Sequence, residues 1–87
     1  MTLSKPTFDQ VKVFFRSWGL IPDDEEHRLT QINDFCRLRM KVDAVALFGK
    51  KFGDFVMKEL VLEDEEYHIG PTKWSDIEKD FKQEFGE

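Results

Sequence analysis

The chain has few of the residues that catalytic and cross-linked sites require, with one cysteine, two histidines and five glycines in 87 residues. Its only cysteine, Cys36, cannot form an internal disulfide, which fits a reducing compartment. Cys36 follows Phe35 on an apolar stripe, so we interpret it as a small buried hydrophobe. No serine lies in a nucleophile elbow, and no glycine-rich phosphate loop is present. We therefore predict a protein that is not an enzyme and that has no cofactor.

Long apolar runs are also missing. No segment approaches the roughly 20 apolar residues that a membrane-spanning helix requires. The first residues, MTLSKPTFDQ, lack the apolar centre and cleavage region of a signal peptide. The formal net charge is -5, so the chain repels phosphate backbones on average. We expect a cytoplasmic protein that binds neither membranes nor nucleic acid.

Potential metal ligands are scarce, although two acid-x-x-His pairs occur. Asp24 and His27, and again Glu65 and His68, would lie one turn apart on a helix, as in carboxylate-bridged di-iron bundles. Both pairs lie in runs of charge beside turn signals rather than on inward-facing stripes. We therefore interpret them as solvated surface residues and predict no metal site.

Aromatic residues are abundant, since nine of the 87 residues are Phe. Each large ring covers roughly 150–250 Å². The length suits one domain and is too short for two. We therefore predict a single helical domain over residues 1–87, with its core spanning approximately residues 7–86. The residues expected to converge in this core are Phe8, Phe14 or Phe15, Trp18, Phe48, Phe52, Trp74, Ile77, Phe81 and Phe85.

Two helices are well marked near the ends of the chain. Thr7 and Gln10 have the spacing of a capping box, and apolar residues follow at helical spacing. Gly19 suits a left-handed stop, so a first helix is expected between Thr7 and Gly19. The segment TKWSDIEKDFKQEFG places apolar residues three and four positions apart and ends at Gly86, which predicts a terminal amphipathic helix.

The middle of the chain is less regular. Pro22 breaks the chain, and a sparse apolar stripe in residues 23–36 predicts a short helix or helical turn. Asp43 can cap a following helix, whose centre Gly49 would weaken. Residues 54–66 fit either a helical continuation or a short extended run, and periodicity leaves both open. The fold class that these elements predict is all-α, a small three- to four-helix bundle.

A basic group lies within this acidic chain. The segment RLRMK and two later lysines supply Arg37, Arg39, Lys41, Lys50 and Lys51. Alternation within RLRMK would place three positive charges on one side of an extended loop, a surface suited to an acidic protein patch or a phosphate group. The simpler interpretation, a solvated loop that balances the acidic runs, stays open.

Two acidic runs indicate a second candidate surface. Their residues are Asp23, Asp24, Glu25, Glu26, Glu63, Asp64, Glu65 and Glu66. Small acidic helical domains can cover the positive active site of a nuclease, because complementary charge speeds association. An acidic inhibitor of the immunity-protein or antitoxin kind is therefore the alternative function.

The segment MKVDAVALFGKKFG resembles the second helix of acyl and peptidyl carrier proteins, which are small acidic four-helix domains. In that family an Asp-Ser-Leu motif precedes an acid and a run of aliphatic residues. Here Val42 stands in the place of the Leu, Asp43 follows it, and Phe52 closes the match. The segments TQINDF and TKWSDIEKDF are similar to the family's flanking regions, so the resemblance covers most of the chain. Lys41 replaces the serine that receives phosphopantetheine, and Met40 replaces the Asp before it.

The resemblance implies a carrier-like fold without prosthetic-group attachment, because a lysine amine cannot form the phosphodiester. Ser75, in the final helix, lacks the flanking residues of an acceptor site. We therefore predict a non-enzymatic protein-binding module whose docking surface combines the basic group with nearby apolar side chains. Its partner is expected to be another protein.

Overall fold

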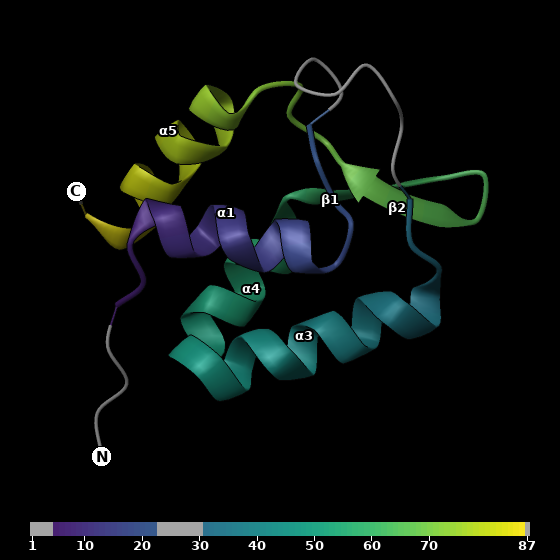
Figure 1. Cartoon of the computed structure of the whole chain (residues 1–87), viewed down its shortest axis with the longest axis horizontal. Coiled ribbons are helices and arrows are strands. Elements are labelled where there is room, and N and C mark those ends of the chain that lie inside the picture. Colours follow the sequence, from purple (N-terminus) through teal and green to yellow (C-terminus); the bar gives the residue numbers. More distant parts are fainter. Residues whose placement is uncertain (1–4, 23–30, 87) are drawn as a thin grey trace.

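Four helices and one β-hairpin make up the described part of the chain, residues 5–22 and 31–86, in the computed structural model (Figure 1). The elements are α1 (Phe8–Ser17), α3 (Asp34–Phe48), α4 (Lys50–Lys58), β1 (Leu60–Glu63), β2 (Glu66–Ile69) and α5 (Trp74–Phe85). The chain is therefore mainly helical, as predicted, but the hairpin corrects the expectation of an all-α fold. Among the described residues, no helix has the length and apolar character needed to cross a membrane.

Helix α1 begins and ends where local chemistry predicted, and so does the end of helix α5. The Thr7 side chain accepts a hydrogen bond from the backbone N–H of Gln10 at 3.2 Å. The Gln10 side chain accepts one from the N–H of Thr7 at 2.8 Å, which completes the capping box. Gly19 has a φ of 75° and Gly86 a φ of 73°, so both glycines adopt the left-handed conformation expected after a helix.

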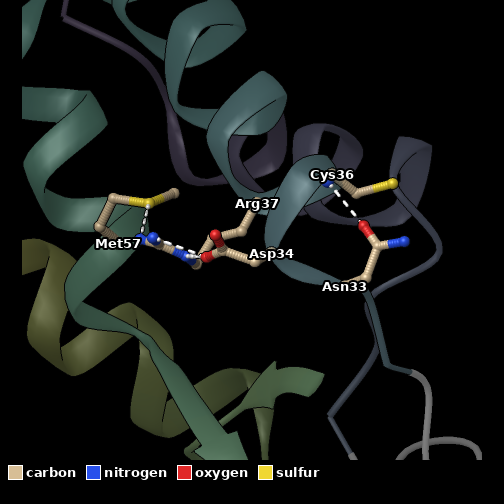
Figure 2. A network of polar contacts seen from close by, with 5 residues as sticks. All are labelled: Asn33, Asp34, Cys36, Arg37 and Met57. Carbon is tan, nitrogen blue, oxygen red and sulfur yellow. Dashed lines mark hydrogen bonds and ion pairs between the residues drawn. The ribbon is translucent and has the colours of Figure 1, made fainter. Parts of the chain in front are cut away.

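Helix α3 begins at Asp34, nine residues before the start predicted at Asp43. The side chain of Asn33 accepts a hydrogen bond from the N–H of Cys36 at 2.8 Å (Figure 2), and Asn is among the best N-cap residues. The segment RLRMK is therefore helical, and the expectation of an extended loop there was wrong. Lys41, which the carrier resemblance places at the mouth of a helix, lies in the middle of α3.

Two glycines set the join between α3 and α4. Gly49 has a φ of 99° and separates the two helices, so it does not lie at the centre of one helix as expected. Glycine adopts such a φ without steric cost. At Gly53 in α4, a Cβ atom would lie 2.5 Å from Cγ2 of Val45 in α3. Only a residue without a side chain allows the two helices to approach this closely.

Residues 54–66 contain both of the structures that periodicity left open. Helix α4 continues to Lys58, and β1 then pairs antiparallel with β2, with Leu60 opposite Ile69 and Glu63 opposite Glu66. Asp64 and Glu65 form the two-residue turn, with φ values of 51° and 70°. Both values are those of the turn type that suits the twist of a hairpin.

Ile32 extends this small sheet on the side of β2. Its N–H donates to the carbonyl of Tyr67 at 2.9 Å, and the N–H of Tyr67 donates to the carbonyl of Ile32 at 2.7 Å. The helical turn expected in residues 23–36 is therefore wrong at Ile32, which is extended. Residues 23–30 lie outside the described residues.

The core is largely aromatic, as the composition indicated. Of the predicted core residues, six are buried: Phe14, Phe15, Phe52, Trp74, Ile77 and Phe81. The other four are partly buried and pack against the core: Phe8, Trp18, Phe48 and Phe85. The prediction omitted nine buried residues: Val11, Leu20, Ile32, Met40, Ala44, Phe55, Val56, Leu60 and Ile69. Phe55 stacks on Phe52, with 6.3 Å between the ring centroids.

Candidate functional site: the outer face of helix α3

Helix α3 is apolar on two opposite faces. Met40 and Ala44, one turn apart, are completely buried in the core. On the opposite face Phe35 is 67 % exposed, Val42 65 % and Leu38 49 %. The solvent side of a surface helix is normally polar, so packing in the core does not account for these three side chains.

The exposed residues form a continuous line, which we call the outer stripe: Phe35, Leu38, Val42 and Ala46. Spacings of three and four residues keep side chains on one face of a helix. Figure 1 shows α3 along one edge of the molecule, with α1 and α4 on the same side of it. The outer stripe is therefore accessible along its length, and contiguous exposed apolar residues of this kind mark interaction sites.

Arg37, the first residue of the predicted basic group, is held within the fold (Figure 2). Its guanidinium group lies 2.9 Å from the Asp34 carboxylate and 4.6 Å from the ring centroid of Tyr67. One of its nitrogens donates to Sδ of Met57 at 3.6 Å. The side chain thus joins α3 to α4 and β2, and its positive charge is already matched.

The other four basic residues do not form one patch. Arg39 is exposed beside the outer stripe, with its guanidinium carbon 5.9 Å from the ring centroid of Phe35. Lys41 is exposed on the other flank of α3. Lys50 and Lys51 are exposed on α4, and the Lys51 ammonium lies 5.0 Å from a phenylalanine ring of α5. Only Arg39 and Lys41 can therefore frame the outer stripe.

A second apolar surface lies between α1 and the end of α3. It is a groove of about 350 Å³, lined by Asp9, Gln10, Val13, Phe14, Ser17, Leu47 and Phe48. Val13 is 66 % exposed and Leu47 55 % exposed. Leu47 lies well to the side of the outer stripe on the helical wheel, so we treat the groove as a separate surface.

Half of the predicted acidic surface lies within the described residues. Glu63, Asp64, Glu65 and Glu66 are all exposed at the tip of the hairpin, whereas Asp23, Asp24, Glu25 and Glu26 lie outside the described residues. The Glu63 carboxylate lies 4.0 Å from Nε2 of the His68 ring. Within residues 5–22 and 31–86, no three potential metal-ligating side chains come together. The pair Asp24 and His27 is outside those residues.

Glu59 is a buried carboxyl group that the sequence did not suggest. It is only 4 % exposed, and its Oε1 atom has no hydrogen-bond partner within the described residues. Burial, together with a hydrogen bond and charge repulsion from Asp80, raises the pKa of Glu59 to about 8. The group lies where α4 ends and faces α5, away from the outer stripe, so it bears on stability rather than on docking.

Comparisons with protein-family models, with curated proteins and with solved structures gave no match.

Proposed function

We propose that the chain is a non-enzymatic protein-binding module and that the outer stripe of α3 is its docking surface. The observation that supports this proposal is the second apolar face of α3, with Phe35 67 % and Val42 65 % exposed. Removing apolar surface from water contributes about 25 cal/mol per Å². A partner that covers these side chains therefore gains free energy that the isolated chain leaves unused.

The surroundings of the outer stripe fit the same role. Arg39 and Lys41 are charged residues on its two flanks, and an apolar centre with a polar rim is the usual anatomy of a protein interface. Arg39 can bind a partner while its guanidinium group stays over the ring of Phe35, since arginine stacks on aromatic faces. Aromatic and arginine side chains are also common among residues that dominate binding.

Capture experiments with matched variants test the proposal. Phe35→Asp and Val42→Asp place a charge on the outer stripe, whereas Leu62→Asp places one on the hairpin, where Leu62 is 58 % exposed. The immobilised protein should lose its captured partners with the first two variants and keep them with the third. Circular dichroism should show that all three are folded. An identical set of captured proteins for all variants would contradict the choice of surface.

The alternative, an acidic inhibitor of a basic nuclease, is supported by the hairpin tip. Four exposed carboxylates lie together there, and Asp64 and Glu65 have positive φ values. Non-glycine residues in this conformation are strained, and such strain is found at functional sites. Salt-sensitive inhibition of a basic nuclease, lost with Glu63→Lys and Glu66→Lys together, would favour this function over the first.

A carrier-like fold without a prosthetic group is the finer part of the proposal. The supporting feature is Lys41, which stands where the resembling family has its acceptor serine. Intact-mass measurement after incubation with coenzyme A and a phosphopantetheinyl transferase should show no increase. A mass increase would mean that another side chain, such as Ser75, accepts the group.

A further inference from the structure

We infer that the outer stripe binds the outer stripe of a second copy of this chain, with the two α3 helices antiparallel about a two-fold axis near residues 40 and 41. The inference rests on the proposed function, because it takes the docking surface from there and names its occupant. A helix suits this surface better than an extended strand does. An extended strand needs hydrogen bonds for its backbone, and the outer face of α3 offers no free backbone groups to form them. A second helix forms its backbone hydrogen bonds internally.

The two halves of the outer stripe match each other in size. About the proposed axis, Phe35 lies beside Ala46 of the second copy, so the largest side chain meets the smallest. Leu38 lies beside Val42 of the second copy, and symmetry repeats both contacts. A parallel pair would instead place Phe35 on Phe35 at one end and Ala46 on Ala46 at the other. Crowding at one end and a void at the other would both lower stability.

The charged residues on one flank of the outer stripe also fit the antiparallel arrangement. Arg39 and Asp43 are exposed one turn apart on the same side of the outer stripe. Neither has an ion-pair partner among residues 5–22 and 31–86. In the antiparallel pair each Arg39 approaches Asp43 of the second copy, so two opposite-charge pairs form. Lys41 lies on the other flank, about a quarter turn from the stripe, where its long side chain can extend into solvent.

The size of the interface sets the strength of association. Phe35 to Ala46 spans about 16 Å at 1.5 Å per residue, which is three turns of helix. Only four apolar side chains on each copy take part, so the contact is smaller than the roughly 1,600 Å² of a standard specific interface. We therefore expect a reversible dimer whose population depends on protein concentration.

Analytical ultracentrifugation of the full chain over a range of concentrations tests the inference. The wild type should form dimers, and Phe35→Asp or Val42→Asp should raise the dissociation constant by about 100-fold, because each places two charges in the apolar seam. The control variant Leu62→Asp changes an apolar residue on β1 that is 58 % exposed, and it should dimerise like the wild type. Circular dichroism checks that each variant is folded.

The antiparallel arrangement has its own test in Arg39→Asp and Asp43→Arg. Each variant alone turns both pairs between the copies into like-charge contacts and should weaken dimerisation by about tenfold at low salt. An equimolar mixture of the two variants should form heterodimers about as well as the wild type. The mixture restores opposite charges between the copies but not within one helix, so local helix effects cannot produce the rescue.

Three results would overturn the inference. The first is a wild type that is monomeric at about 1 mM, where even a weak interface associates. The second is a dimer that Phe35→Asp leaves intact. The third is a mixture of Arg39→Asp and Asp43→Arg that associates no better than either variant alone. If the wild type is monomeric while Phe35→Asp still abolishes capture of a different protein, the second copy is the wrong occupant and the proposed function stands. If Phe35→Asp abolishes neither association nor capture, both proposals fail.

Discussion

Replacing Glu59 by Gln should stabilise the protein at alkaline pH. The Glu59 carboxyl is only 4 % exposed and faces Asp80, and its pKa is raised from 4.5 to about 8. The largest cause is burial, followed by the hydrogen bond with Asp80 and the charge of that residue. Near pH 6 the protonated carboxyl can donate to Asp80, and a glutamine amide of similar shape can do the same. The variant should therefore match the wild type in acid and surpass it in base.

The sign of the effect follows from proton binding. Between the unfolded pKa of 4.5 and the folded pKa of about 8, the folded chain holds a proton that the unfolded chain has lost. The stabilisation from Glu59 is therefore complete below pH 4.5, and it is lost progressively as the pH rises towards 8. One pH unit in this window corresponds to about 1.4 kcal/mol, so the whole window amounts to about 3–5 kcal/mol. That is a large share of the roughly 5–15 kcal/mol by which domains are stable.

Urea unfolding at pH 6, 7, 8 and 9 measures this effect. The difference in unfolding free energy between Glu59→Gln and the wild type should grow by about 2–3 kcal/mol from pH 6 to pH 8 and then level off. Groups that the substitution leaves unchanged contribute equally to both proteins, so their contributions cancel in the difference. Glu63→Gln, at an exposed carboxylate of the hairpin, is the control and should follow the wild type throughout. Parallel curves for Glu59→Gln and the wild type would refute the reasoning, because Glu59 would then ionise without cost.

Four further predictions concern stability and can be checked by the same urea titrations. Phe52→Ala should cost about 3–5 kcal/mol, because Phe52 is completely buried and contacts three other phenylalanine rings. Lys41→Ser, at an exposed position, should change stability by no more than about 0.5 kcal/mol. Glu65→Gly should stabilise the hairpin by about 0.5–1 kcal/mol, since glycine adopts the φ of 70° without strain. Gly53→Ala should cost about 1–3 kcal/mol, because its Cβ would lie 2.5 Å from Val45 Cγ2, and Val45→Ala should recover part of the loss.

The elements that could be predicted from sequence are those whose signals lie within one helical turn. The capping box of Thr7 and Gln10 and the left-handed Gly19 and Gly86 depend only on neighbouring residues, so the ends of α1 and the end of α5 were correct. The start of α3 was predicted wrongly, although Asn33 is a side chain that commonly caps helices. Asp43 is also a plausible cap, and the two apolar faces of α3 weaken the periodicity that would have shown a helix running through it.

The hairpin and the buried carboxyl depend on contacts that sequence spacing does not encode. The pairing of β1 with β2 is decided by residues that face each other across the strands, and the turn at Asp64 and Glu65 lacks the glycine that usually marks such hairpins. Glu59 follows Lys58 within the largely apolar segment FVMKELVL, and a glutamate is almost never fully buried unless it is paired. Its burial follows from the packing of α5 against the end of α4, as its interaction with Asp80 indicates.

The basic group shows that the directions of charged side chains depend on the secondary structure of the segment that carries them. In an extended loop Arg37, Arg39 and Lys41 would point the same way, but on α3 they point in different directions, and Arg37 contacts Asp34 and Tyr67. The same helical periodicity that separates these charges gathers Phe35 and Val42 on one exposed face. Neither residue is needed to bury Met40 or Ala44, so a polar outer face would leave the monomer folded and more soluble. The proposed docking surface therefore rests on the helical periodicity of α3 rather than on the charge pattern of the sequence.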